Sequence, residues 1–135
     1  MGSEMCIRDR VKIRIFDDPQ VPPVPMDPDQ MRQVMLNVML NGLEAMPDGG
    51  VLEARVSRAP ENRSVAIEIS DNGSGSEGVD MERIFDPFYT TKAEGTGLGL
   101  SICFQLVKNH GGTITARANE DRGLAFRIEL PLEES

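Results

Sequence analysis

The sequence predicts an α+β domain, an α/β sandwich in which helices pack on one face of a mixed, mostly antiparallel sheet. Apolar and polar residues alternate, as in strands, at 11–16, 51–58, 64–70, 113–118 and 124–130. Two longer segments, 29–46 and a run that follows three glycines and ends at His110, have helical spacing. The order is strand, helix, hairpin, long loop, helix, hairpin, and 135 residues suit one domain with its own core.

Composition narrows the classes of partner. The net charge of −8 argues against nucleic acid or an anionic membrane as the main partner. A polyphosphate ligand would therefore need a metal ion, a lysine or a helix end close by. The sequence has no membrane-spanning apolar run and no signal peptide pattern. Cys6 and Cys103 make no disulfide framework, which fits a reducing cytoplasm.

Helix-capping residues, prolines and glycines set the expected boundaries of the domain and its helices. Residues 1–10, MGSEMCIRDR, lack apolar periodicity and are interpreted as a non-native leader before the domain at 11–135. Asp27 is the predicted N-cap of the first helix, with Pro28 in its first turn. A short helix is expected at about 80–84. Gly111 and Gly112 are expected to end the last helix.

The first helix carries a polar stripe among apolar residues. Because its apolar positions nearly encircle it, burial on almost all sides is expected. The stripe consists of Gln30, Gln33, Asn37, Asn41 and Glu44, at steps of three or four residues. It could face solvent or satisfy nearby backbone groups. Two Asn at a spacing of four are poor helix formers, however, and their amide oxygens suit a hard cation such as Mg²⁺.

Two glycine-containing segments suggest ligand contacts. Asp71-Asn72-Gly73-Ser74-Gly75 follows a strand, so that its acid could accept hydrogen bonds from an adenine; a plain Asx or glycine turn is the alternative. In TTKAEGTGLGLS, residues 90–101, three alternate glycines precede a helix N-terminus beside a lysine, which favours a phosphate cradle. The spacing matches neither a P-loop nor a dinucleotide fingerprint, and alone it could be a linker or a turn.

Four motifs occur in a set order: QVMLNVMLNGLEAM, DNGSG, IFDPFYTTK and GTGLGLSICFQLVKNHGGTI. Together they resemble the catalytic ATP-binding domain of sensor histidine kinases, within the family that includes gyrase, the Hsp90 chaperones and MutL. The resemblance covers about residues 11–131 and implies the Bergerat α/β sandwich. TTK followed closely by GTGLGLS is most similar to the nitrogen-regulator type of kinase.

The resemblance implies roles for individual residues. Asn41 corresponds to the Mg²⁺ ligand, Asn37 lies near the phosphates, and Asp71 corresponds to the adenine-binding acid, with Gly73 and Gly75 opening the pocket floor. Phe85 and Phe88 fall in the phenylalanine box of the ATP lid, and residues 76–96 are expected to be mobile without nucleotide. Asn37 and Lys92 are candidates for positioning phosphate. The other expected ATP contacts are Glu44, Ala45, Phe88, Thr90, Thr91, Gly95, Thr96, Gly97, Leu98, Gly99 and Leu100. Gly42 stands where alanine is commoner, and Glu44 where many relatives have a basic residue, which puts more weight on Lys92.

The implied activity is kinase chemistry with ATP and Mg²⁺. Members that hydrolyse ATP carry a Glu four residues before the metal-binding Asn, whereas this chain has Asn37, which cannot serve as a general base. The expected function is to bind Mg-ATP and position its γ-phosphate for a histidine on a separate dimerisation domain, upstream of a response regulator. His110, the single histidine, is interpreted as a helix C-terminal residue favoured by the dipole. This chain alone is therefore not expected to autophosphorylate. It is also expected to be monomeric.

Two other functions fit the same pocket. One is a stand-alone serine kinase of the anti-sigma-factor kind, and the other is a nucleotide-responsive binding module without transfer activity. The phenylalanine box followed by TTK favours the histidine kinase branch.

Overall fold

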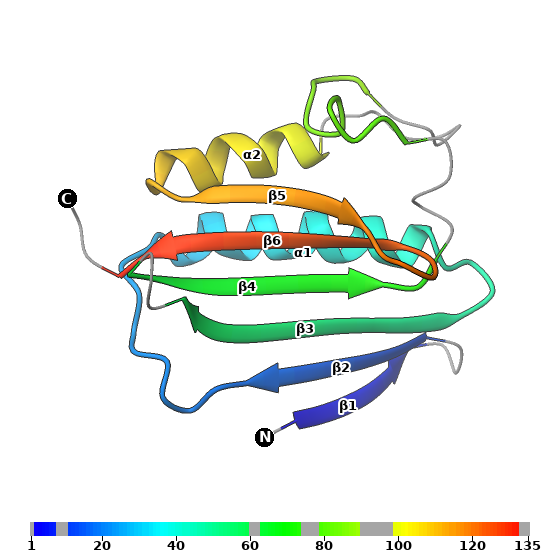
Figure 1. Ribbon diagram of the computed structural model, residues 1–135, viewed down its shortest axis with the longest axis horizontal. Coiled ribbons are helices and arrows are strands. Elements are labelled where there is room, and N and C mark those ends of the chain that lie inside the picture. Colours follow the sequence, from blue (N-terminus) through cyan, green and yellow to red (C-terminus); the bar gives the residue numbers. More distant parts are fainter. Residues whose placement is uncertain (1, 8–10, 60–62, 74–78, 90–98, 133–135) are drawn as a thin grey trace.

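The chain forms a two-layer sandwich of one sheet and two helices (Figure 1). The computed structural model describes residues 2–7, 11–59, 63–73, 79–89 and 99–132, and for 2–7 the backbone alone. The strands are β1 (Gly2–Ile7), β2 (Val11–Asp17), β3 (Gly50–Ala59), β4 (Ser64–Asp71), β5 (Thr113–Ala118) and β6 (Leu124–Pro131), and the helices are α1 (Pro28–Glu44) and α2 (Gly99–Asn109). Neither helix of this described part combines the length and apolarity needed to cross a membrane.

The sheet is mixed and mostly antiparallel, as predicted. Its strand order is β1-β2-β3-β4-β6-β5. In this described sheet β2 and β3 run parallel, and every other neighbouring pair is antiparallel. Figure 1 shows α1 crossing behind the strands, with α2 near β5, so that both helices cover one face. The expected fold class is confirmed.

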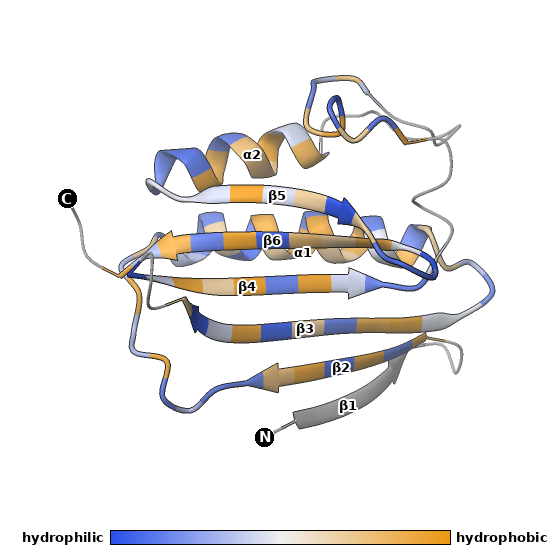
Figure 2. Cartoon of the chain, in the orientation of Figure 1, coloured by the Kyte–Doolittle hydropathy of each residue, from blue (hydrophilic) through white to orange (hydrophobic). Residues whose placement is uncertain are grey.

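Alternation along the strands separates the two faces of the sheet. Apolar and polar bands alternate along β3, β4 and β6 in Figure 2. Ile13, Leu52 and Asp71 lie opposite one another across β2, β3 and β4, in a row that faces the helices. The next row, which includes Arg14, Glu53 and Ser70, lies on the open face. The main core therefore forms between the sheet and the helices, where burying apolar surface contributes about 25 cal/mol per Å².

The start of α1 and the end of α2 lie where the capping residues predicted, whereas α1 ends at Glu44, two residues before the predicted end at residue 46. The side chain of Asp27 accepts hydrogen bonds from the backbone N–H groups of Asp29 (3.0 Å) and Gln30 (3.1 Å), and Pro28 occupies the first turn. At the end of α2, the Gly111 N–H donates to Lys108 (2.9 Å) and the Gly112 N–H donates to Val107 (3.0 Å). Gly111 has a φ of +73°, so these bonds form a Schellman cap.

The helix expected at 80–84 was wrong. Residues 81–88 form consecutive turns, with N–H to C=O bonds from Arg83 to Asp80, from Asp86 to Arg83 and from Tyr89 to Asp86. The cause is tertiary: Ile84 is buried in the core, and the Phe85 ring packs against those of Phe104 and Phe126. These anchors hold the segment in turns rather than in a regular helix.

The expectation that α1 is buried on almost all sides was also wrong. Met31, Val34 and Val38 are buried, but Leu36 is 51% exposed and Leu40 is 43% exposed. The sheet covers one side of α1 and α2 covers a second side, so Leu36 and Leu40 lie on the side that neither layer reaches.

The first residues form a strand that the sequence did not predict. β1 pairs with β2 in antiparallel register, from Gly2 opposite Phe16 to Ile7 opposite Val11. Pairing of backbone N–H and C=O groups at a sheet edge needs no apolar alternation, which explains why the pattern gave no signal. The interpretation of residues 1–10 as a non-native leader stays a prediction.

Candidate functional site

Asp71 is a buried acid at the end of β4. It faces the helix layer and is 4% exposed. The Gly73 N–H donates to its Oδ1 at 2.9 Å, which is an Asx turn. The turn proposed as an alternative to ligand binding is therefore present, but it does not explain why an acid is buried beside the core. Burying a carboxylate costs free energy unless its oxygens have hydrogen-bond partners. The groups that contact Asp71 favourably are therefore hydrogen-bond donors.

Two glycines allow α1 to approach Asp71 closely. A Cβ at Gly42 would lie 2.8 Å from Leu52 Cδ1 and 3.4 Å from Asp71 Oδ2. A Cβ at Gly73 would lie 2.4 Å from the carbonyl oxygen of Ala45, the residue that caps α1. The chain's own packing thus requires glycine at Gly73, where a Cβ would meet backbone, whereas a Cβ at Gly42 would require the Leu52 side chain to shift. The expected role of Gly73 in the pocket floor stays a prediction.

The backbone of Asp71 is held by the turn between β5 and β6. Asn119 Nδ2 donates to the Asp71 carbonyl at 2.9 Å and to Ser70 Oγ at 3.0 Å. A Cβ at Gly123 would lie 2.1 Å from the same carbonyl oxygen, and Gly123 has a φ of +96°. Neither Asn119 nor Gly123 was predicted from the sequence to contact β4. The glycine at 123 indicates a turn, but no local sequence pattern connects that turn with β4.

The polar stripe of α1 joins the two helices. Gln33 Nε2 donates to Asn37 Oδ1 at 3.1 Å, and Asn37 Nδ2 donates to the Gly99 carbonyl at 3.3 Å. Asn37 also forms a hydrogen bond with the Cys103 side chain. Asn41 is half-buried one turn further along the same stripe, whereas Glu44 at the helix end is exposed. The stripe therefore runs beside the start of α2, where Asn37 satisfies a backbone carbonyl, and the use of its amide oxygens as ligands for a cation stays a prediction.

Cys103 lies in the core between the helices. Its thiol is fully buried and lies 3.6 Å from the Val34 carbonyl oxygen. Burial raises the pKa of Cys103 to about 11, and the hydrogen bond with Asn37 acts in the opposite direction. A neutral buried thiol is a packing group rather than a nucleophile.

Gly99, the first residue of α2, has space around it on the side of the described residues. Among these, the nearest atom to a Cβ built there is Asn37 Cγ at 4.0 Å, an ordinary contact. The packing of the described part therefore does not require glycine at this position, in contrast to Gly73. A bare backbone at a helix N-terminus suits the approach of an anion.

Several predicted ATP contacts lie outside the described residues. These are Gly75, Thr90, Thr91, Lys92, Gly95, Thr96, Gly97 and Leu98, together with parts of the expected mobile lid, 76–78 and 90–96. Leu100 packs partly buried against the core, and Ala45 is buried. The two phenylalanines of the expected lid differ: Phe85 packs in the core, whereas Phe88 is 74% exposed with a φ of +67°.

His110 connects the end of α2 to the start of α1. Its Nε2 accepts a hydrogen bond from the Asp27 N–H at 3.0 Å, and its Nδ1 lies 2.8 Å from the Leu106 carbonyl oxygen. A carbonyl partner requires Nδ1–H, and an N–H partner requires a bare Nε2. Nε2 thus links the end of α2 to the N-cap of α1, while Nδ1 holds the ring against the last turn of α2.

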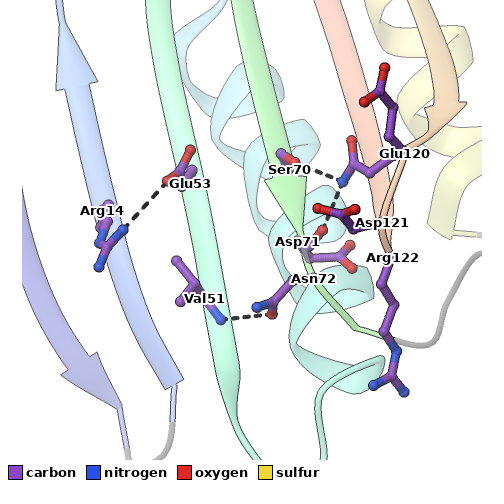
Figure 3. A pocket seen from close by; sticks show the side chains of 10 residues that line it. Arg14, Val51, Glu53, Ser70, Asp71, Asn72, Glu120, Asp121 and Arg122 are labelled. Atoms are coloured by element: carbon purple, nitrogen blue, oxygen red, sulfur yellow. Dashed lines mark hydrogen bonds and ion pairs between the residues drawn. The ribbon is translucent and has the colours of Figure 1, made fainter.

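A polar cavity of about 600 Å³ lies beside the end of β4 (Figure 3). Its lining includes Arg14 and Glu53 from the open face of the sheet, and Glu120, Asp121 and Arg122 from the β5–β6 turn. Figure 3 shows this turn next to Ser70 and Asp71. The mixed charges favour no single ligand class.

Comparison with known proteins agrees with this arrangement. Residues 26–134 match the family model for the histidine kinase-, DNA gyrase B-, and HSP90-like ATPases. The chain belongs to this family, and its fold and motifs are those of the catalytic ATP-binding domain of sensor histidine kinases. The nitrogen-regulator type stays a prediction.

Individual relatives are similar over most of this chain. It is 35% identical over 126 residues to Sporulation kinase E of Bacillus subtilis (strain 168), covering 93% of this chain and 17% of the relative. It is 37% identical over 122 residues to Sensor histidine kinase ZraS of Escherichia coli (strain K12), covering 90% of this chain and 26% of ZraS. The chain thus spans about a quarter or less of these curated relatives.

Solved structures show the same fold. The nucleotide-free catalytic domain of histidine kinase ThkA superimposes with a TM-score of 0.77 at 31% identity, covering 91% of this chain and 78% of that domain. ThkA in complex with the response regulator protein TrrA superimposes with a TM-score of 0.74 at 28% identity, covering 91% of this chain and 34% of ThkA.

Proposed function

We propose that this domain binds ATP with Mg²⁺ and holds the γ-phosphate for transfer to a histidine on a separate dimerisation domain. The observation that carries the proposal is the Asn37–Gly99 contact, which brings the amide stripe of α1 beside the N-terminus of α2. Neutral amide oxygens for a hard cation and helix N–H groups for a phosphate then border the same space. The buried Asp71 supplies the third component of the proposed ATP site, a hydrogen-bond acceptor for the adenine ring.

Asp71 is suited to select adenine. A carboxylate accepts hydrogen bonds and donates none, so it favours the amino group of adenine over the carbonyl of guanine. Because Asp71 is buried, a base that places a carbonyl opposite its carboxylate would bring two hydrogen-bond acceptors together away from water. This cost gives selection between bases, as well as affinity.

The start of α2 is suited to hold phosphate. Gly99 leaves the backbone open at the helix N-terminus, where the partial positive charge attracts anions. The resemblance adds Lys92 and the preceding glycines to this contact. With a net charge of −8, the chain depends on such local groups to attract a triphosphate.

Asn41 would hold the metal through its amide oxygen. Among the described residues no cluster of three or more His, Cys, Asp or Glu side chains could enclose a metal ion. One neutral oxygen donor is enough for an Mg²⁺ ion that takes its other ligands from phosphate and water. When bound, the ion would neutralise phosphate charge.

Asn37 supports transfer rather than hydrolysis. It occupies the position of the general base in ATP-hydrolysing relatives, and a carboxamide cannot take a proton from water. Its Oδ1 accepts from Gln33 and its Nδ2 donates to Gly99, so it acts by holding the α2 terminus. Phosphoryl transfer depends mainly on positioning and charge neutralisation, which such an arrangement can supply.

The partners follow from the same proposal. The phosphoacceptor is a histidine on another domain, because both ring nitrogens of His110 are engaged, Nε2 with the Asp27 N–H and Nδ1 with the Leu106 carbonyl. A response regulator downstream is supported by the ThkA–TrrA complex. The domain would act in the cytoplasm, and as an isolated unit it would be monomeric.

Calorimetry with a non-hydrolysable ATP analogue, with and without Mg²⁺, tests the proposal. Asn41→Ala is expected to remove the effect of Mg²⁺, and Asp71→Asn is expected to weaken binding of the base. Gln30→Ala and Asp17→Asn serve as matched controls, since Gln30 is on the same helix as Asn41 and Asp17 is exposed at the end of β2. Failure of the wild-type protein to bind the analogue at millimolar concentration would overturn the proposal.

The acceptor separates the histidine kinase from a serine kinase. The domain is incubated with labelled ATP and either a histidine-containing dimerisation domain or a candidate anti-sigma antagonist. Acid-labile label on the dimerisation domain supports the proposal. Acid-stable label on the antagonist would favour the serine kinase, and binding without either transfer would favour a nucleotide-responsive module.

A further inference from the structure

We propose that Asn119 is a positioning residue for Asp71, and that it thereby sets the preference for adenine. This inference rests on the proposed function of Asp71 as the acceptor for the base. It concerns a residue that lies 48 positions away in sequence, in the turn between β5 and β6.

The paired register between β4 and β6 stops one residue before Asp71. The last matched pair is Ser70 with Ala125, whereas on the other side Asp71 still pairs with Leu52 of β3. In an antiparallel sheet a carbonyl at this point would be bound by an N–H of the neighbouring strand. Here Asn119 Nδ2 donates to the Asp71 carbonyl at 2.9 Å instead. A side-chain amide thus takes the place of the strand.

The turn holds Asn119 rigidly against this carbonyl. The Asn119 N–H donates to the Gly123 carbonyl at 2.9 Å, which closes the turn. Gly123 passes so close that a Cβ would lie 2.1 Å from the Asp71 carbonyl oxygen. Asn119 Nδ2 also donates to Ser70 Oγ at 3.0 Å, so both hydrogens of its amide have acceptors. Hydrogen bonds of its backbone N–H and of its side-chain amide therefore hold Asn119 in place.

Fixing the carbonyl also fixes the carboxylate. On the β3 side, Asn72 Oδ1 accepts from the Val51 N–H at 2.9 Å, and the Gly73 N–H donates to Asp71 Oδ1 at 2.9 Å. Asn119 completes the set on the β6 side, so that the backbone of Asp71 is held on both edges. Binding geometry of this kind tolerates errors of only about 0.5 Å.

The charged residues of the same turn do not share this role. Glu120, Asp121 and Arg122 are exposed, and Figure 3 shows their side chains bordering the cavity beside β4. Asn119 is half-buried and makes both hydrogen bonds to β4. Glu120 is therefore a matched control: it neighbours Asn119 in sequence and lines the same cavity.

The test compares binding of ATP and GTP analogues to the wild-type domain, Asn119→Ala and Glu120→Ala. Loss of this part-buried hydrogen bond, and with it the alignment of the Asp71 carboxylate, is expected to weaken ATP binding by up to about tenfold. GTP binding should weaken less, since guanine presents its O6 acceptor where adenine presents an amino donor and so depends less on the exact placement of the Asp71 carboxylate. The ratio of the two affinities should therefore fall in Asn119→Ala and stay unchanged in Glu120→Ala.

The ratio is the readout that separates positioning from stability. A merely structural Asn119 would lower the melting temperature, and with it both affinities equally, so an unchanged ratio overturns the inference. If Asn119→Ala does not fold, Asn119→Ser is measured in the same way and its ratio decides. A wild-type domain that binds ATP no better than GTP would instead contradict the role proposed for Asp71 itself.

Discussion

The Asn37 side chain on α1 holds the first residue of α2, because its Nδ2 donates to the Gly99 carbonyl at 3.3 Å. Gln33 in turn donates to Asn37 Oδ1 at 3.1 Å, so that two consecutive turns of α1 contribute to one contact. At its other end α2 is joined to α1 through His110 and the Asp27 N–H. The two helices are thus connected at both ends of α2, which fixes its N-terminus relative to the amide stripe.

Gln33→Ala should weaken binding of the ATP analogue without unfolding the domain. Gln33 is exposed, so its removal exposes little new surface, but Asn37 loses the partner that orients its amide. A hydrogen bond of this kind contributes about 0.5 to 1.5 kcal/mol, which corresponds to roughly a 2- to 10-fold loss of affinity. Calorimetry measures the loss. Gln30→Ala, on the same stripe, is the control, and equal affinities in the two variants would contradict the role of Gln33.

Gly42→Ala should lower both the stability of the domain and its affinity for ATP. The added methyl would lie 2.8 Å from Leu52 Cδ1, whose side chain is fully buried, and 3.4 Å from Asp71 Oδ2. Overpacking typically costs about 1 to 3 kcal/mol, which exceeds the gain of about 1 kcal/mol in helix propensity. Urea unfolding gives the change in free energy. A more stable variant would show that Leu52 moves aside at no cost.

The strands and the helix ends could be predicted because their causes are local. Alternation of apolar and polar residues along β3 and β4 indicates which residues face the core. Asp27 caps α1 by accepting hydrogen bonds from backbone groups two and three residues further along the chain. Asn37 and Asp71 were named as candidates because their residue types are unusual in a helix interior and at a buried strand end. Each of these signals lies within a few residues of the feature it predicts.

The features that were missed depend on contacts between distant segments. Asn119 meets Asp71 across 48 residues, and its place in a turn gave no hint of its partner. The helix expected at 80–84 was wrong because Phe85 packs against Phe104 and Phe126, which overrides local propensity. The exposure of Leu36 and Leu40 likewise depends on which sides of α1 the other layers cover.

Gly99→Ala should separate ligand binding from stability. Among the described residues the nearest atom to the added methyl is Asn37 Cγ at 4.0 Å, so this part of the folded domain can accept it without strain. Alanine also has the higher helix propensity, by about 1 kcal/mol in helix interiors. The melting temperature should therefore stay the same or rise, while affinity for the ATP analogue falls because the methyl narrows the approach to the α2 N-terminus. Unchanged affinity would remove Gly99 from the proposed phosphate contact.

The Cys103 thiol should make the stability of the domain depend on pH above about 9. Burial raises its pKa in the folded state from 9.0 to about 11. The unfolded chain therefore loses this proton before the folded chain does, and the free energy of unfolding falls as pH rises from 9 to 11. The contribution of this thiol is complete below pH 9, and its loss approaches about 1.4 kcal/mol per pH unit between the two pKa values.

Urea unfolding of Cys103→Ala at pH 8 and at pH 10 isolates this effect, with both proteins carrying Cys6→Ser so that one thiol titrates. The alanine variant should be less stable at pH 8, because it leaves a small cavity in the core. The difference between the two proteins should shrink at pH 10, since the alanine variant lacks the titrating group while its remaining groups respond alike. A difference that stays constant with pH would show that the Cys103 thiol ionises equally in the folded and unfolded chains.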